Sequence, residues 1–124
     1  MTLQEREARA CAIIDSMAEE LCDVSLYLHD NPELGLDEHK AVKVINQFLE
    51  THNFTSQVGL TDLPELQTAL RGDYNGSAQH KIAFLGEYDA LPELGHGCGH
   101  NLIAMMSLGA AIAFSQSAPE AWGT

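Results

Sequence analysis

Residues 81–101 read KIAFLGEYDALPELGHGCGHN, and this stretch determines the class of fold. It opens with the short apolar run Lys81–Leu85, which is bounded by glycine and predicts a β-strand. It closes with the loop Gly95–Asn101, in which one thiol and two imidazoles alternate with three glycines. Open α/β sheets place their sites beyond the carboxyl ends of central strands. The order of strand and loop therefore predicts an α/β protein whose functional loop leaves such a strand.

The side chains around this loop have the chemistry of a metal site. Cys98 offers a soft sulfur, His100 a borderline nitrogen, and Glu87 and Asp89 hard oxygens. This mixture suits a transition metal, zinc above all, with manganese and cobalt as alternatives. On a helix, residues two positions apart point to nearly opposite sides, so Cys98 and His100 can share an ion only from loop backbone. The glycines between them permit such backbone, and we predict both residues as metal ligands.

The neighbouring residues have more than one role open to them. Asp89 can ligate the ion, or it can accept an N–H from an imidazole and orient that ring. Glu87 and His96 are further candidate ligands, and His96 can instead bind substrate. Without a metal, the same residues would be a structural free thiol beside a helix-capping histidine, solvated carboxylates at a strand end and an ordinary loop histidine.

The composition excludes several classes of partner. Eighteen acidic and six basic side chains give a net charge of −12, whereas nucleic acids and anionic membranes require clustered Lys and Arg. We therefore expect neither nucleic acid nor a membrane as a partner. Three cysteines leave at least one unpaired, and the N-terminus has no apolar leader. Both features predict a reducing, cytoplasmic location.

The apolar spacing predicts three helices. The first covers residues 3–29 and ends at Asn31-Pro32, because the residue before a proline leaves the helical region. The second follows a cap at Asp37 and ends at Asn53. Its predicted inner face consists of Ala41, Val42, Ile45, Phe48 and Leu49. The third is a buried helix over residues 102–115, for which Asn101 is the predicted N-cap.

Short strands complete the prediction. Leu66–Leu70 and Lys81–Leu85 lie on either side of a turn, and its Asn75–Ser77 loop predicts that the two strands are antiparallel neighbours. Trp122–Thr124 has the pattern of the entry to a further strand. The sequence thus predicts a partial α/β/α layer domain with two N-terminal helices, short strands, a metal loop and a buried helix.

Two signatures in the chain resemble those of the zinc aminoacylase/dipeptidase superfamily. One is Phe84–Pro92 (FLGEYDALP), followed by the loop Gly95–Asn101 (GHGCGHN). The other is Leu28–Gly35 (LHDNPELG) with Glu38, which resembles a His-x-x-Pro-Glu-Leu signature of the amidohydrolase branch. That branch includes aminobenzoyl-glutamate utilisation proteins and β-alanyl-lysine-type dipeptidases. The two signatures occur in the expected order, and the resemblance covers nearly the whole chain.

The resemblance implies a function and roles for residues. It implies hydrolysis of an amide bond in a small peptide or N-acyl amino acid, with two divalent ions in a cleft. Cys98 and His100 align with metal ligands of the branch, and Asp89 matches an aspartate that orients a ligand. Other branches carry a metal-binding histidine where this chain has Glu87, so Glu87 departs from their pattern.

The resemblance also implies that residues 1–124 are the N-terminal part of a metallopeptidase-type catalytic domain. In the family, the catalytic base, which belongs to a paired-glutamate motif, lies further along the sequence. Two more histidine ligands and a lid domain that mediates dimerisation follow it, and none of them is in this chain. We therefore expect little activity from the isolated chain, and self-association through unpaired strand edges.

Two rival functions stay open. One is a non-catalytic fragment that holds a single metal ion or associates with a full-length relative. The other is a thiol-dependent redox protein that uses Cys98, and a low thiol pKa that ignores metal would mark it.

Overall fold

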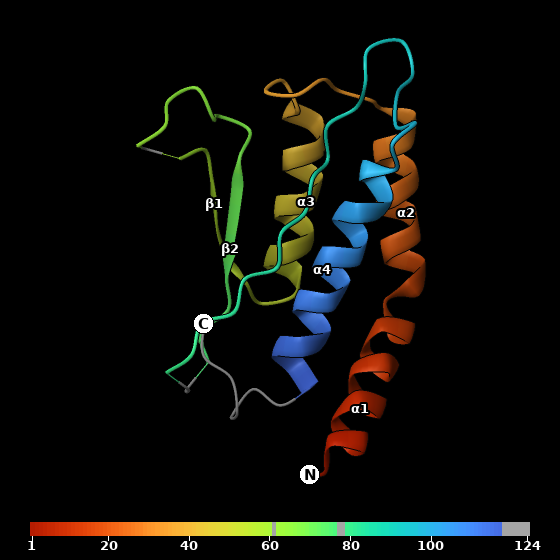
Figure 1. The fold of residues 1–124 in the computed structure, drawn as a ribbon, viewed down its shortest axis with the longest axis vertical. Helices are drawn as coiled ribbons and strands as arrows, with labels where there is room; N and C mark the ends of the chain where they lie inside the picture. The colour runs from red at the N-terminus through yellow and green to blue at the C-terminus, as the bar shows by residue number, and fades with distance from the viewer. Residues whose placement is uncertain (61, 77–78, 118–124) are drawn as a thin grey trace.

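The computed structural model describes residues 1–60, 62–76 and 79–117 (Figure 1). Its elements follow the order α1 (Leu3–Ser16), α2 (Ala18–Asp30), α3 (His39–Thr51), β1 (Thr55–Val58), β2 (Leu70–Asp73) and α4 (His100–Ser117). The mixed α/β class is confirmed, whereas the predicted α/β/α layering stays a prediction. The pattern at Trp122–Thr124 lies outside the described residues.

The first helix is broken, so the prediction of one helix over residues 3–29 is wrong at Met17. There the backbone takes φ −111° and ψ 14°, which separates α1 from α2. Neither glycine nor proline marks the break, and the apolar spacing runs through it, so the pattern does not reveal it. Met17 itself is buried. α1 and α2 both pack against α4, one after the other along its length (Figure 1).

The second predicted helix, α3, begins differently from the prediction. Its N-cap residue is Glu38, whose side chain makes no capping bond, so the prediction of Asp37 as the cap is wrong. Instead the carboxylate of Glu33 accepts hydrogen bonds from the amides of Lys40 and Ala41, each at 2.8 Å. The loop after α2 folds back over the start of α3, and this tertiary contact replaces a local cap.

The end of α3 confirms the prediction at Asn53. This residue has φ 67°, the left-handed conformation that asparagine tolerates at a helix end. Its amide donates to the carbonyl of Glu50, and the amide of Phe54 donates to the carbonyl of Leu49, both at 3.1 Å. These two bonds are the Schellman pattern, which satisfies carbonyls that the helix leaves free.

The sheet differs from the prediction in both of its strands. β1 and β2 pair antiparallel, with Thr55 opposite Asp73 and Val58 opposite Leu70. β1 escapes notice in the sequence because its residues, TSQV, include a single apolar side chain. Lys81–Leu85 is not a strand, and the predicted pairing of Leu66–Leu70 with it is wrong. The reason is that β2 takes β1 as its partner.

Residues 81–89 instead run as an extended segment alongside α4 (Figure 1). The hydroxyl of Ser107 donates to the carbonyl of Leu85, and the ring of Phe84 lies 5.6 Å from that of Phe114. Glycine at position 86 allows this approach, because a Cβ there would stand 3.2 Å from the Cβ of Ser107. The segment is thus held by one helix rather than by neighbouring strands.

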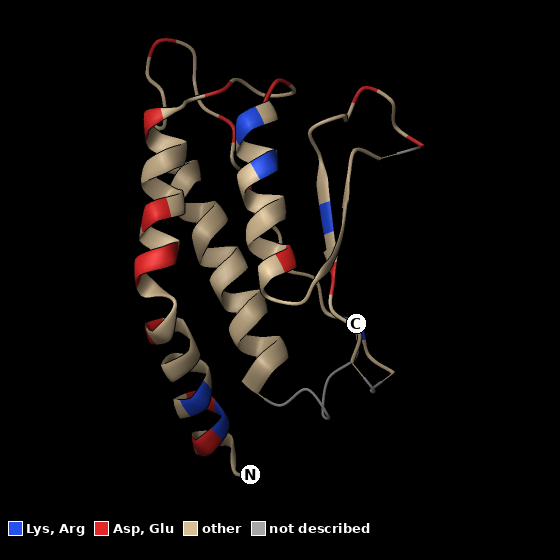
Figure 2. Ribbon diagram, turned by 180° about the vertical axis from the view of Figure 1, so that it is seen from behind, with Lys and Arg blue, Asp and Glu red and all other residues tan. Residues whose placement is uncertain are grey.

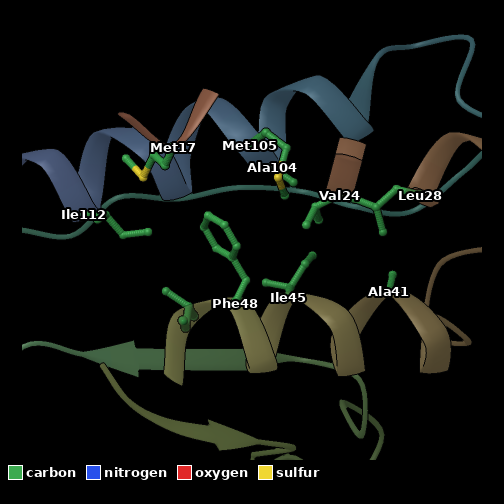
Figure 3. Packing of buried hydrophobic residues seen from close by; sticks show 10 residues of the cluster. Met17, Val24, Leu28, Ala41, Ile45, Phe48, Ala104, Met105 and Ile112 are labelled. Carbon is green, nitrogen blue, oxygen red and sulfur yellow. The ribbon is translucent and has the colours of Figure 1, made fainter. Parts of the chain in front are cut away.

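One apolar cluster joins the helices. Figure 3 shows α3 facing α2 and α4 across this cluster, and every side chain predicted for the inner face of α3 is buried. The members from the three helices are Val24, Leu28, Ala41, Ile45, Phe48, Leu49, Ala104, Met105 and Ile112, joined by Met17. The core therefore lies between the α2–α4 pair and α3, with the small sheet beyond α3.

The start of α4 corrects a further prediction. The helix begins at His100, so Asn101 lies in its first turn and is not an N-cap. The amide of Asn101 is buried and donates to the backbone carbonyl of Ser25 at 3.3 Å and to its hydroxyl at 3.1 Å. A long-range contact with α2 therefore uses the side chain that the local pattern assigned to capping.

The acidic excess lies on the outer faces of α1 and α2 and on the loops, while α4 carries no charged side chain (Figure 2). Within the residues described, no helix combines the length and the hydropathy that crossing a bilayer requires.

Candidate functional site

The site forms where the extended segment 81–89 meets the loop before α4. The amide of Ala90 donates to the carbonyl of Glu33 at 2.7 Å, and a parallel bridge pairs Leu34 with Ala90. The loop after α2 is therefore fastened to the end of the segment. The two sequence signatures, more than fifty residues apart, meet at this point.

His100 is the centre of the site. Its Nδ1 lies 2.8 Å from Oδ1 of Asp89 and 3.0 Å from the Asp89 carbonyl oxygen. Its Nε2 lies 3.0 Å from Oε2 of Glu87. The His100 side chain is 21% exposed, Asp89 is 35% exposed and Glu87 is 64% exposed. The structure thus brings together three of the predicted site residues, with one imidazole between two carboxylates.

The charges of this cluster act on the protonation of His100. Burial lowers the pKa of the imidazole, but the hydrogen bond to Asp89 and the negative charges of Asp89 and Glu87 outweigh it. The net effect raises the pKa of His100 above its ordinary value of 6.5. The carboxylates therefore favour a positive charge at this position, whether it is carried by a proton or by a cation.

Cys98 stands apart from this cluster. It is a free thiol with an exposed side chain, two residues before His100. In the part of the chain that the structure describes, no three side chains of His, Cys, Asp or Glu gather closely enough to hold a metal ion. Shared ligation by Cys98 and His100 therefore stays a prediction.

His96 lies inside the loop, and its ring is only partly exposed. Its Nδ1 is buried and has no hydrogen-bond partner. Burial and the nearby rings of His29 and His100 lower the pKa of His96, and a hydrogen bond with the backbone of Leu28 and the charge of Asp89 only partly oppose them. A buried ring nitrogen without a partner costs free energy, so this atom marks an incompletely satisfied position beside the site.

Sequence reasoning missed two neighbours of the site. His29, at the end of α2, lies near enough to His96 to influence its pKa. Tyr88 stands between the two carboxylates in sequence, and its hydroxyl donates to the backbone carbonyl of Thr68. Burial and the charge of Glu38 raise the pKa of Tyr88 to about 12, so the hydroxyl keeps its proton at neutral pH. The alternation of side chains along the segment was the available signal for Tyr88.

Comparison with known proteins identifies relatives. No family model matches the chain. The chain is 37% identical over 116 residues to the Xaa-Arg dipeptidase of Mus musculus and 35% identical over 119 residues to that of Homo sapiens, and each alignment covers 89% of the chain and 27% of the relative. It is 30% identical over 117 residues to a p-aminobenzoyl-glutamate hydrolase of Escherichia coli, across 81% of the chain and 24% of that protein.

The chain therefore spans about a quarter of the length of the curated relatives that it matches. The matched region covers most of the chain, which includes both signatures and the cluster around His100. Over the part that it shares with these relatives, the chain belongs to the amidohydrolase branch of the aminoacylase/dipeptidase superfamily.

Proposed function

We propose that this chain contributes part of the active site of a metal-dependent hydrolase that cleaves the amide bond of a dipeptide or an N-acyl amino acid. The observation that carries the proposal is the imidazole of His100, which lies between the carboxylates of Asp89 and Glu87. The names of the relatives supply the substrate class, because a dipeptide ending in arginine and p-aminobenzoyl-glutamate both contain an amide bond to an amino acid.

The donor set suits a divalent ion. A proton on Nδ1 of His100 would be donated to Asp89, which leaves the lone pair of Nε2 on the side of Glu87. Histidine ligands commonly donate their second ring N–H to a carboxylate in this way. We therefore propose His100, Cys98 and Glu87 as ligands and Asp89 as the residue that orients His100. His96, with its unpartnered Nδ1, is a further candidate.

Zinc is the proposed metal, with manganese or cobalt as alternatives, because sulfur, nitrogen and oxygen donors occur together. A bound divalent ion would polarise the amide carbonyl and lower the pKa of a water molecule. The task of this chain is to place that charge beside the substrate. The free thiols of Cys11, Cys22 and Cys98 support the proposed cytoplasmic location.

We further propose that residues 1–124 are the N-terminal part of the catalytic domain and have little activity on their own. Coverage of about a quarter of the relatives supports this, since residues elsewhere in those proteins have no counterpart in this chain. General base catalysis also requires a group that moves a proton to the leaving amine, and no residue described here is assigned that role.

Calorimetric titration with zinc chloride tests the proposal. The wild-type chain should bind zinc, and both His100→Gln and Cys98→Ser should weaken binding at least tenfold. His39→Gln is the matched control, because His39 is an exposed histidine paired with a carboxylate on another loop. Equal zinc affinity in the wild type and in His100→Gln would overturn the proposal.

The same preparation separates the rival functions. Hydrolysis of an Xaa-Arg dipeptide that stops on addition of a chelator would show a complete enzyme. Bound zinc without turnover would favour a non-catalytic metal-binding fragment. A Cys98 thiol that reacts rapidly at neutral pH and is indifferent to zinc would favour the redox function.

A further inference from the structure

Next to the cluster of Glu87, Asp89 and His100 lies a chain of polar groups that the proposed function does not use. The hydroxyl of Tyr88 donates to the backbone carbonyl of Thr68, and the hydroxyl of Thr68 donates to Oε2 of Glu38. Thr68 is 3% exposed and Glu38 is 9% exposed. The three residues come from separate places: the segment before the site, the loop before β2 and the start of α3.

These groups satisfy one another. A buried carboxylate is costly unless it accepts hydrogen bonds, and Thr68 supplies one to Glu38. The carbonyl of Thr68 receives its own bond from Tyr88, whose ring also packs against the apolar cluster. Polar networks whose members are satisfied hold their side chains in one arrangement. The hydroxyl of Tyr88 is therefore anchored to a rigid part of the molecule.

The position of Tyr88 in the chain links this anchor to the site. Side chains alternate between opposite sides of an extended segment, so Tyr88 points away from its neighbours Glu87 and Asp89. Fixing the Tyr88 side chain fixes the rotation of the segment about its own axis. That rotation decides whether the two carboxylates reach the Nδ1 and Nε2 atoms of His100, which they do at 2.8 and 3.0 Å.

A second restraint acts on the same segment from the other side. The space next to Gly35 is shared, since a Cβ on that residue would stand 3.8 Å from Oδ2 of Asp89 and 4.0 Å from Oε1 of Glu38. The loop that carries Gly35 also accepts the amide of Ala90 through Glu33. Glu38 is thus near both ends of the arrangement, with one oxygen bonded to Thr68 and the other close to the loop that borders Asp89.

We propose that Tyr88 is a positioning residue, whose hydroxyl, held through Thr68 by Glu38, sets Glu87 and Asp89 against His100. Its effect on zinc binding rests on the proposed function. Its effect on the geometry of the His100 ring does not, and the two are measured separately.

Tyr88→Phe removes only the hydroxyl and keeps the ring in the apolar cluster. The ring nitrogens of His100 are followed by ¹⁵N NMR of the full chain at a pH where the imidazole is neutral. In the wild type the proton should lie mainly on Nδ1, which faces two oxygens of Asp89. In Tyr88→Phe the two tautomers should become more evenly populated, and zinc affinity should fall about tenfold.

Two further variants and a control complete the test. Thr68→Val breaks the bond to Glu38 and should reproduce Tyr88→Phe, whereas Thr68→Ser keeps a hydroxyl and should resemble the wild type. Tyr27→Phe is the control, because Tyr27 is a partly exposed tyrosine on α2. A Tyr88→Phe spectrum and zinc affinity equal to those of the wild type would overturn this inference. Failure of the wild type to bind zinc, with the tautomer shift still present, would overturn the proposed function and leave this inference standing.

Discussion

Asp89 Oδ1 lies 2.8 Å from His100 Nδ1, although the two residues are eleven positions apart. The loop between them closes on itself, because Leu91 and Gly95 exchange backbone hydrogen bonds of 2.8 and 3.1 Å. Asp89 and His100 stand at the two ends of this closed loop. The contact is therefore built into the backbone rather than into long side chains, which favours a preorganised site.

Substitution of Asp89 by asparagine should weaken zinc binding by about ten- to a hundredfold. The amide keeps the shape of the side chain but loses the charge that holds the Nδ1 proton of His100. Calorimetric titration measures the change. Asp37→Asn is the matched control, since Asp37 forms an exposed contact of 3.0 Å with His39. An equal loss of affinity in both variants would mean that overall charge, not orientation of His100, governs binding.

The metal-free protein should lose the contribution of His100 to stability as the pH rises. The pKa of His100 is raised in the folded state, so folding favours the protonated ring. The stabilisation is complete below the ordinary value of 6.5 and is lost as the pH rises through the raised pKa. Urea unfolding of the wild type and of His100→Gln should therefore differ most on the acidic side. A difference that grows toward alkaline pH would contradict the assignment.

His96 should show the opposite dependence. Its pKa is lowered in the folded state, so folding favours the neutral ring. Its contribution is present above the ordinary value of 6.5 and is lost as the pH falls through the lowered pKa. Urea unfolding should therefore show that His96→Gln is less sensitive to acid than the wild type. His80→Gln, an exposed histidine outside the site, is the control and should keep the acid sensitivity.

The amino-acid sequence predicts the chemistry of the site better than its arrangement. The residue types of Glu87, Asp89 and His100 are enough to indicate charged or metal chemistry. Their meeting depends on the closed loop 90–99, whose hydrogen bonds are not encoded by a local motif. Cys98 has the right chemistry and the right spacing, yet its side chain is exposed, because spacing constrains where a loop can reach and not where it points.

The same division applies to the fold. The end of α3 at Asn53 follows from one residue's tolerance of positive φ. The break at Met17 and the use of Asn101 depend on packing against α4 and α2, which local patterns do not contain. The partner of a strand is likewise a long-range choice, so the apolar run at residues 81–85 shows a preference for extended backbone but does not specify a neighbour.

The cap that Glu33 provides should be worth roughly 1–2 kcal/mol. Glu33→Ala leaves the amides of Lys40 and Ala41 without their acceptor, and the free energy of unfolding from urea titration should fall by that amount. Glu33→Gln keeps one acceptor oxygen and should lose less. Glu65→Ala, an exposed glutamate in a loop, is the control. Equal stability of Glu33→Ala and the control would show that another group caps α3.

The extended segment 81–89 should make the chain associate with itself. Leu85 is 86% exposed, and Ile82 and Phe84 are exposed beside it. An extended apolar segment without a paired strand is a template for another chain. Sedimentation velocity should therefore show a mass that grows with protein concentration. Because each copy carries a charge of −12, association should strengthen when added salt screens the repulsion.

Leu85→Glu separates this segment from other exposed apolar residues. It places a charge at the centre of the template and should return the protein to a monomer at the same concentration. Leu3→Glu is the control, because Leu3 is 72% exposed on α1, far along the chain from the segment. A wild-type chain that stays monomeric and melts cooperatively at all concentrations would show that α4 alone protects the segment. Equal dissociation by both variants would locate the contact elsewhere, since only added charge would then be common to them.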